Sequence, residues 1–311
     1  MKKQEFGFNS ATGVCRIYGC EYLPDSNEVK AVVVIHHGMA EHQERYLDFI
    51  SFLTENGFAV FMHDMANHGR SNQNKKETGF FGKKNGYKAL VQDFRTVFLM
   101  AKDKYPDKKT VVMGHSMGSF IVRCFTAWYS GSGFNGAIYM GTGGANPMAG
   151  AGDFLSGAIS RLSGPLHKSN LIDKMTFGSY NNRFEKRTNF DWLTRDTDIV
   201  DEYIADEYCG FLFSAQGMND LIKLNVHANC EEWYNAVPKD IPILVISGDM
   251  DPVGNYGSDI KNIHAKLKST GHSKAVLKLY KDGRHEILNE INRKEVYEDI
   301  LSFIQTDVLG D

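Results

Sequence analysis

Apolar runs and amphipathic stretches alternate along much of the chain. Runs rich in Val, Ile and other apolar residues predict strands at 30–37, 58–63, 111–113, 136–140, 241–246 and 275–280, of which 30–37 and 111–113 read as buried. Apolar positions at helical spacing predict helices at 44–56, 88–104, 119–128, 259–267 and 293–308. Strands that alternate with helices indicate a parallel sheet with helices on both faces. Residues 6–23 alternate irregularly around two glycines and predict an antiparallel hairpin at the sheet edge.

A segment at 146–240 interrupts this alternation and is far longer than the roughly 2–6 residues of an ordinary connection. It carries one-sided apolar stripes at helical spacing. These are Leu155, Ile159, Leu162 and Leu166, then Ile199, Val200, Tyr203, Ile204 and Tyr208, then Met218, Leu221, Ile222 and Leu224. We therefore predict a core formed by residues 1–145 and 241–311, with an inserted helical cap at 146–240.

Composition and charge narrow the class of protein. Of the 311 residues, 42% are hydrophobic and 23% are charged, as in ordinary globular domains, and the net charge of -3 predicts no nucleic-acid surface. The five cysteines form no C-x-x-C pair, which argues against a disulfide framework or zinc ribbon and suits a reducing compartment. The N-terminus lacks the apolar core of a signal peptide, and no run approaches the ~18 apolar residues of a membrane span. We expect a cytosolic protein.

The stretch TVVMGHSMG at 110–118 carries the strongest chemical signal. A short apolar run leads into the G-x-S-x-G pattern of residues 114–118, and a stretch with helical spacing follows. Strand, G-x-S-x-G and helix in this order are typical of a nucleophile elbow, a strained turn that presents a serine at a helix N-terminus. A Cβ at 114 or 118 would collide with the neighbouring strand or helix, which explains both glycines. Ser116 is therefore the predicted nucleophile.

A serine nucleophile needs a base, and the base needs an acid that orients it. In an elbow fold the acid and then the histidine follow the serine along the chain. His285 is the predicted base, since of the eleven histidines only this one lies beyond the last strand. Two aspartates follow the strand at 241–246. We favour Asp251, which lies further out and precedes Pro252, over Asp249, which suits turn capping.

The tetrahedral intermediate of acyl transfer needs two hydrogen-bond donors for its oxyanion. We assign them to the amide of Met117, which follows the nucleophile, and to the amide of Met39, in the loop after the strand at 30–37. Gly38 permits the close backbone approach that this loop requires. The other histidines near these strands match no metal motif, and we expect them to hydrogen-bond loop backbone: His36, His37, His42, His63 and His68.

Five segments together resemble the monoacylglycerol lipase and lysophospholipase branch of the α/β-hydrolases, of the S33 serine aminopeptidase type. They are HHGMAEHQERY (36–46), HDMANHGRS (63–71), GHSMG (114–118), SGDMDPV (247–253) and GRHEILNE (283–290). The resemblance implies the α/β-hydrolase fold and covers nearly the whole chain outside the cap. It also implies that Ser116, Asp251 and His285 form a catalytic triad. The backbone amides of Met39 and Met117 are the implied donors to the oxyanion.

Two positions depart from the pattern of that family. Ala40 stands at the second glycine of the usual H-G-x-G-E-H, and Asn67 stands before His68 where D-x-x-G-H-G has glycine. The first change stiffens the oxyanion loop, and neither removes a catalytic group.

The leading hypothesis is a serine esterase, without a cofactor, that acts on esters of single-chain lipids such as monoacylglycerols or lysophospholipids. Three alternatives are a general short-chain carboxylesterase, an aminopeptidase of the proline-iminopeptidase type and a non-enzymatic protein of the same fold. An intact triad argues against the last. An aminopeptidase needs cap carboxylates for a substrate ammonium. The candidates are Asp196, Asp198, Asp201, Glu202, Asp206 and Glu207.

The first stripe of the cap also carries a prediction. Glycines flank it on both sides, and glycines absorb backbone rotation at little cost. We expect the segment 148–166 to be a mobile lid over Ser116, whose apolar face meets the acyl chain when closed and a membrane or micelle surface when open. The predicted substrate contacts are Leu155, Ile159 and Leu162.

Overall fold

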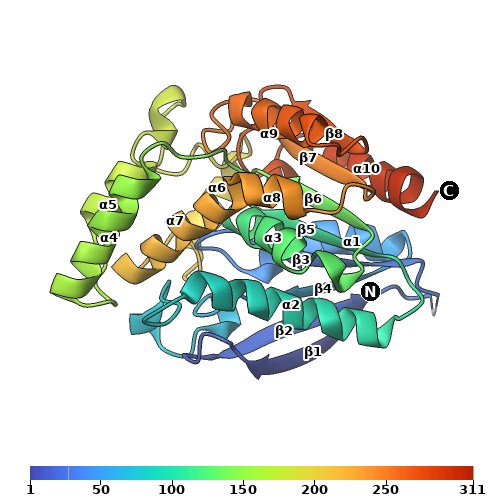
Figure 1. Cartoon of the computed structure of the whole chain (residues 1–311), viewed down its shortest axis with the longest axis horizontal. Helices are drawn as coiled ribbons and strands as arrows, with labels where there is room; N and C mark the ends of the chain where they lie inside the picture. The colour runs from blue at the N-terminus through green and yellow to red at the C-terminus, as the bar shows by residue number, and fades with distance from the viewer. Residues whose placement is uncertain (27, 311) are drawn as a thin grey trace.

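A computed structural model describes residues 1–26 and 28–310, so Asn27 and Asp311, both inside the predicted core ranges, lie outside it. At its centre is an eight-stranded sheet with the order β1-β2-β4-β3-β5-β6-β7-β8 (Figure 1). β2 pairs antiparallel with β1 and β4, and the other neighbours pair parallel. The strands are β1 (Lys2–Asn9), β2 (Arg16–Leu23), β3 (Ala31–His36), β4 (Phe58–His63), β5 (Thr110–His115), β6 (Gly136–Met140), β7 (Ile243–Gly248) and β8 (Ala275–Tyr280).

Helices cover both faces of this sheet. In the core they are α1 (Leu47–Glu55), α2 (Gly86–Lys104), α3 (Met117–Trp128), α9 (Ser258–Ser269) and α10 (Arg293–Ser302). A π-helical segment, Phe303–Leu309, continues α10 to the end of the described chain. The predicted fold class, a mostly parallel sheet with helices on both faces, is confirmed. The predicted edge hairpin is confirmed too, with β1 and β2 as its two strands.

The parallel strands divide their side chains between two apolar cores. Along β3, Val32 and Val34 belong to the core shared with α2, α3 and α9, whereas Val33 and Ile35 belong to the core shared with α1 and α10. All six residues of β3 are buried. A strand covered on both faces has no solvent side, and this accounts for the unbroken apolar run in the sequence.

Between β6 and β7 the chain leaves the sheet and forms further helices. They are α4 (Ala149–Ser163), α5 (Asn170–Phe177), α6 (Thr197–Ala205), α7 (Ala215–Asn229) and α8 (Glu231–Ala236). α7 and α8 pack against α3, and α4 packs against α7. α4 and α5 stand at one end of the molecule, away from the sheet (Figure 1). Within the described residues, every helix is too short or too polar to cross a bilayer.

The sharpest packing constraint lies where α3 passes β3. A Cβ added to Gly118, in the first turn of α3, would stand 2.3 Å from the carbonyl oxygen of His37 and 2.4 Å from that of His36. A Cβ added to Gly114 would stand 2.4 Å from the carbonyl oxygen of Gly118. Contacts this short with backbone atoms cannot be relieved by rotating a side chain. The two glycines therefore set how closely the helix approaches the sheet.

We expect Gly118→Ala to lower the free energy of unfolding by about 3 kcal/mol or more, because the methyl group must push backbone apart in a packed core. Gly131→Ala is the matched control, since nothing lies within 4 Å of its added Cβ, and it should change stability by less than about 0.5 kcal/mol. Urea unfolding of both variants measures the difference. Equal stability of the two would contradict the packing argument.

Candidate active site

Ser116 occupies a strained turn between β5 and α3. Its backbone has φ 53° and ψ -124°, a combination that residues with a side chain rarely adopt. The turn is held on both sides: the Ser116 amide donates to the carbonyl of Met140 at 2.9 Å, and the Ser119 hydroxyl donates to the Ser116 carbonyl at 2.5 Å. The side chain is thereby directed to the carboxyl edge of the sheet, at the N-terminus of α3.

His285 and Asp251 meet at the same edge. The Nδ1–H of His285 donates to Asp251, with both carboxylate oxygens at 3.0 Å. The carboxylate also accepts from the Ser247 hydroxyl and the Val253 amide, each at 2.9 Å. Asp251 is wholly buried and His285 is 2% exposed. With Nδ1 bound to the carboxylate, the Nε2 atom of His285 is the nitrogen free to take a proton from a nucleophile.

The other candidate acid has a different role in the loop. Asp249 accepts a hydrogen bond from the amide of Asp282 at 2.7 Å and thereby ties the loop after β7 to the loop after β8. Of the two aspartates that the sequence offers, the structure brings only Asp251 to His285.

Two rings fix the plane of the His285 imidazole. Trp192 lies with its ring centroid 5.1 Å away, and His115 lies 4.7 Å away. Among the hydrogen bonds of the described residues, none joins Ser116 to His285, although both side chains line one cavity. Such bonds are often long or misaligned before substrate arrives. Trp192 comes from the cap and is a neighbour of His285 that the sequence stripes did not indicate.

In the loop after β3, the amide of Met39 lies between two amides that are hydrogen-bonded. The Gly38 amide donates to the Glu41 carboxylate at 2.6 Å, and the Ala40 amide donates to Nε2 of His68 at 3.3 Å. No described residue accepts from the Met39 amide between them, and Met39 lines the cavity beside Ser116. Met117 opens α3, and the first amides of a helix have no partner within it. Both predicted oxyanion amides thus stand next to the serine.

A buried ionic network lies behind this loop. The Glu41 carboxylate accepts from Arg45 at 2.8 Å and from Nδ1 of His115 at 3.2 Å, while Arg45 also binds both oxygens of Glu286, at 2.7 and 2.6 Å. Nε2 of His115 donates to the His285 carbonyl at 3.3 Å. The network therefore joins the loops that carry Met39, Ser116 and His285. All four ionisable members lie in motifs quoted above, but their pairing is visible only in the fold.

Electrostatics keep the network charged. Burial alone would raise the pKa of Glu41, but the hydrogen bond from His115 and the charge of Arg45 bring it well below its ordinary value. Burial alone would lower the pKa of His115, but its hydrogen bond to Glu41 raises it. Both nitrogens of His115 face oxygen acceptors, which fits an imidazolium.

Four further histidines are buried and neutral. Burial and the neighbouring ring of His37 lower the pKa of His36 to about 3, burial lowers that of His68 to about 4, and burial takes that of His63 well below its ordinary value. His37, whose pKa burial and His68 lower to about 3, accepts from the Met65 amide at 2.8 Å. His37 and His68 therefore act as hydrogen-bond acceptors for loop amides, as expected. The same expectation is wrong for His63, whose nitrogens have no hydrogen-bond partner among the described residues, and for His42, whose Nε2 pairs with the Asp206 carboxylate.

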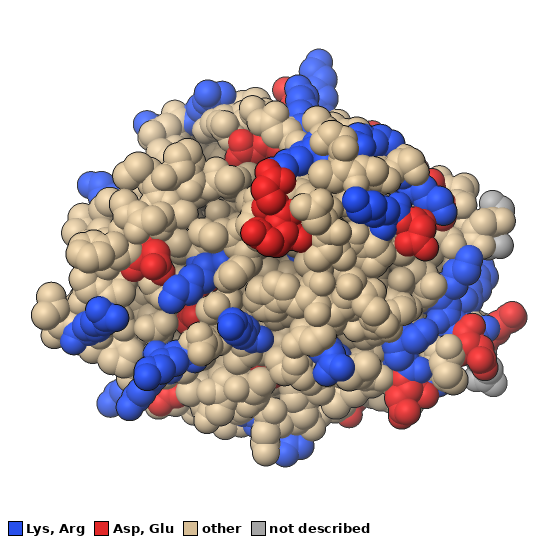
Figure 2. Space-filling model, in the orientation of Figure 1, with Lys and Arg blue, Asp and Glu red and all other residues tan. Residues whose placement is uncertain are grey.

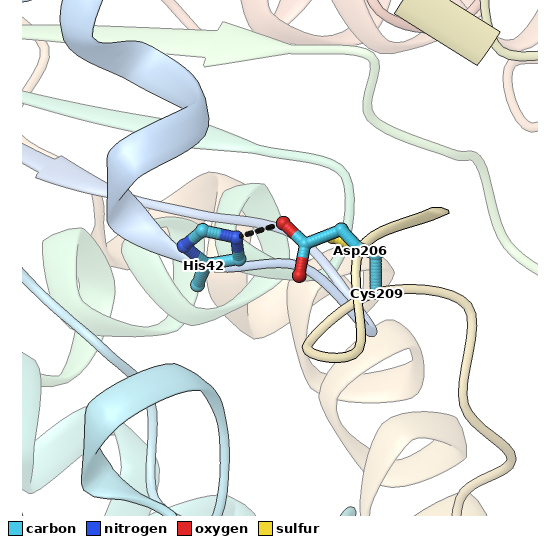
Figure 3. Close-up of side chains that lie close together, drawn as sticks. All are labelled: His42, Asp206 and Cys209. Carbon is cyan, nitrogen blue, oxygen red and sulfur yellow. Dashed lines mark hydrogen bonds and ion pairs between the residues drawn. The ribbon is translucent and has the colours of Figure 1, made fainter. Parts of the chain in front are cut away.

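One cluster has donors of the kind that bind metals. His42, Asp206 and Cys209 place their ligand atoms within 4.8 Å of one another (Figure 3). However, Nε2 of His42 lies 2.8 Å from Oδ2 of Asp206. Two ligands on a tetrahedral zinc, with bonds of about 2.0–2.2 Å, stand roughly 3.3 Å apart. A metal would have to separate this pair, so we interpret the contact as a hydrogen bond between the oxyanion loop and the cap.

The serine opens into a large cavity between the sheet edge and the cap. Its volume is about 950 Å³. Its apolar wall includes Phe120, Phe177, Phe211, Leu221, Ile222 and Val253. The predicted contacts Leu155, Ile159 and Leu162 do not line it: Ile159 packs against the core, and Leu162 is 88% exposed. The helix was located correctly from its stripe, but α4 contributes only its first residue, Ala149, to the cavity lining. The cap side of the cavity comes mainly from α5, α6, α7 and the segments that connect them.

The sheet, its helices and the elbow define an α/β-hydrolase. The chain belongs to the Hydrolase_4 family, described as serine aminopeptidase S33, whose model matches residues 27–292. It is 26% identical over 305 residues to a monoacylglycerol lipase of Mycolicibacterium smegmatis, which covers 97% of each chain. It is 26% identical over 277 residues to the monoglyceride lipase of Mus musculus, covering 88% of this chain and 80% of that one.

Among solved structures, the chain resembles a thermostable carboxyl esterase from Bacillus coagulans, determined in complex with glycerol. The two share 31% sequence identity and a TM-score of 0.92, and the match covers 99% of each chain. The chain is therefore a serine hydrolase of the esterase and lipase group.

The buried neutral histidines generate a prediction about acid stability. Their folded pKa values lie below the unfolded value of about 6.5, so between those limits the unfolded chain binds more protons. The free energy of unfolding that these neutral histidines contribute is fully present above pH 6.5 and is lost as the pH falls. Between pH 7 and pH 5.5, each of these histidines should lower the free energy of unfolding by about 1 kcal/mol. Groups whose pKa is raised in the folded state oppose this loss: burial raises the pKa of Asp93 and Asp220 to about 6, and the pKa values of Asp64, Asp173 and His115 are also raised. The contribution of the histidines is therefore measured by removing one of them.

His63→Leu isolates one of these groups, because no described residue hydrogen-bonds to either nitrogen of His63. We expect a smaller loss of unfolding free energy between pH 7 and pH 5.5 in this variant, by about 1 kcal/mol, in urea titrations. The control is His167→Gln, at an exposed position. Parallel curves for wild type and His63→Leu would show that His63 does not titrate on unfolding.

Proposed function

We propose that this serine hydrolase cleaves carboxylic esters of single-chain lipids, monoacylglycerols or lysophospholipids, through an acyl-enzyme on Ser116. The observation that carries the proposal is the shared cavity of about 950 Å³, which Ser116, His285, Met39 and Met117 all line. A cavity of this size with an apolar wall suits one acyl chain together with a small head group. The monoacylglycerol lipase relatives support the same substrate class.

The reaction follows from the positions of the polar groups. Ser116 attacks the ester carbonyl while Nε2 of His285 takes its proton, and Asp251 stabilises the imidazolium that forms. The amides of Met39 and Met117 receive the negative charge on the carbonyl oxygen. His285 then protonates the departing alcohol. Water activated by the same nitrogen attacks the acyl-enzyme, and the fatty acid leaves with no cofactor involved.

The cap supplies the acyl side of the proposed substrate site. Phe177 from α5 and Leu221 and Ile222 from α7 line the cavity opposite Phe120 of α3. We retain residues 146–240 as the cap, and its movement as a lid stays a prediction. Because Leu155, Ile159 and Leu162 do not line the cavity, the acyl contacts are reassigned to Phe177, Leu221 and Ile222.

The outer end of the cap supports a transient contact with lipid surfaces. α4 and α5 expose several large apolar side chains, and the corresponding end of the molecule in Figure 2 is mostly uncharged, with scattered Lys and Arg side chains and fewer Asp and Glu side chains. Apolar side chains with basic neighbours favour the surface of a membrane or micelle. The exposed side chains are Met148, Phe154, Leu162, Leu171 and Met175.

The aminopeptidase alternative loses its predicted ammonium site. None of the six predicted carboxylates lines the cavity, although another acidic side chain of the cap, Asp173, does. Several of the six are paired with basic side chains instead. Asp196 pairs with Arg293 at 2.9 Å, Asp201 with Arg187 at 2.7 Å and Asp206 with His42 at 2.8 Å. Comparing cleavage of aminoacyl amides with cleavage of monoacylglycerols separates the two functions, and we expect only the esters to be turned over.

Ser116→Ala should lower kcat for a monoacylglycerol by a factor on the order of 10⁴ or more, because the acyl-enzyme cannot form. Released fatty acid measures the rate, and a fluorophosphonate probe should label the wild type and not the variant. Retention of a tenth of the activity by Ser116→Ala would rule out this nucleophile. Labelling of the wild type without turnover of any ester would instead favour a non-enzymatic role.

The two aspartates provide a matched pair for the same assay. Asp251→Asn should lower kcat by about 10⁴, since only the group that touches His285 sets its tautomer. Asp249→Asn removes a carboxylate two residues away that binds only loop backbone among the described residues, and should leave kcat within a few-fold. The reverse ranking would identify Asp249 as the orienting acid.

The reassigned acyl wall is tested on α7. Ile222→Asp should sharply lower kcat/KM for long-chain monoacylglycerols and spare a short acetate ester, because a charged group in the acyl site must be desolvated by the chain. Val226→Asp is the control, one turn along the same helix, 45% exposed and outside the cavity lining. Equal losses on both esters for Ile222→Asp would assign Ile222 to cap packing and not to acyl binding.

A further inference from the structure

Two hydrogen-bond donors from the cap meet at one backbone atom of the oxyanion loop, the carbonyl oxygen of Ala40. The Tyr203 hydroxyl, from α6, donates to the Ala40 carbonyl at 3.0 Å, and the Gly210 amide donates to the same oxygen at 3.0 Å. A carbonyl has two lone pairs, so these two bonds saturate it. Both donors lie more than 160 residues from Ala40 along the chain, and Tyr203 is only 6% exposed.

Two further contacts join the same pieces of chain. Oδ2 of Asp206 pairs with Nε2 of His42 at 2.8 Å (Figure 3), and the guanidinium of Arg45 lies over the Tyr203 ring at 4.8 Å. The segment 203–210 of the cap therefore binds the loop on both sides of Glu41, at Ala40 and at His42.

Ala40, whose carbonyl accepts both of these hydrogen bonds, has a strained backbone. Ala40 has a φ of 52°, a left-handed conformation that its Cβ disfavours, and it stands where the related pattern H-G-x-G-E-H has glycine. A residue held there persists only when its surroundings fix it. The His68 contact fixes the Ala40 amide, and the cap fixes its carbonyl.

We infer that the cap positions the oxyanion hole, with Tyr203 as the positioning residue that acts through the Ala40 carbonyl. The bonds at Gly38 and Ala40 restrict the peptide units on both sides of Met39, which lines the cavity, and so favour one orientation of its amide. Undocking of the segment 203–210 would release Ala40 and allow the Met39 amide to turn away from the serine. This inference rests on the proposed function, since it assigns to Met39 the role of oxyanion donor.

Tyr203→Phe tests the inference, because it removes the hydroxyl and keeps the ring against Arg45. Tyr297→Phe is the matched control. Tyr297 lies on α10, its hydroxyl donates to the Leu288 carbonyl at 3.0 Å, the residue is also 6% exposed, and its ring packs against Phe49 and Phe52 of α1. We expect kcat to fall about tenfold in Tyr203→Phe, less than the 10²–10³ lost when an oxyanion donor itself is removed. KM should stay within about twofold, and Tyr297→Phe should keep the wild-type kcat.

The substrate panel separates positioning from direct contact with a head group, since Tyr203 also lines the cavity. A positioning role lowers kcat equally for a monoacylglycerol and for a chromogenic acetate ester that has no glycerol. A loss confined to the glycerol ester, or a kcat unchanged in Tyr203→Phe, would overturn the inference.

Amide hydrogen exchange provides a readout that does not depend on turnover. Exchange of the amides at 38–42 should become several-fold faster in Tyr203→Phe and should stay unchanged in Tyr297→Phe. If the wild type cleaves no ester, the proposed function fails. Faster loop exchange would then still show that the cap holds the loop, and unchanged exchange would overturn that as well.

Discussion

The catalytic edge of this molecule depends on how closely α3 approaches β3. Two glycines make this approach possible, because a methyl group on Gly118 would meet the backbone of His36 and His37 at 2.4 Å or less. The same proximity forces the tight turn at Ser116, whose strained φ and ψ are held by bonds to neighbouring backbone. It also brings the loop after β3 beside the serine, so that Met39 and Met117 can serve one oxygen atom. The distance between α3 and β3 thus determines the positions of the nucleophile and of both proposed oxyanion donors.

The ionic network behind the site has a different physical basis. Placing Glu41, Arg45, His115 and Glu286 in the interior costs desolvation energy, and buried ion pairs often fail to repay that cost in stability. Their value here lies in geometry. The network binds the Gly38 amide and the His285 carbonyl to a common set of charges, so loops from three strands keep a fixed relation. Such groups favour a single arrangement more than they add to the free energy of unfolding.

The sequence was informative where a local pattern has one structural meaning. Continuous apolar runs located the central strands, because only a strand covered on both faces dispenses with polar positions. The order of serine, aspartate and histidine after three parallel strands predicted which side chains meet, and the pairing of Asp251 with His285 follows that order. The sequence was less informative about the cap. A stripe such as Leu155, Ile159 and Leu162 indicates a helix with an apolar side, but not the surface that this side faces. Contacts such as Tyr203 with Ala40 join residues 163 positions apart and leave no local trace.

The insertion of the cap between β6 and β7 has a consequence for how such proteins diversify. Closing a loop costs entropy that grows only with the logarithm of its length, so the parallel pair β6–β7 tolerates almost any excursion between its strands. Evolution can therefore replace or lengthen this segment and alter substrate range without disturbing the sheet. The contact at Ala40 limits that freedom. A transplanted cap would have to bring donors of its own to the same carbonyl, so cap and oxyanion loop are expected to be inherited together, as one recombination unit.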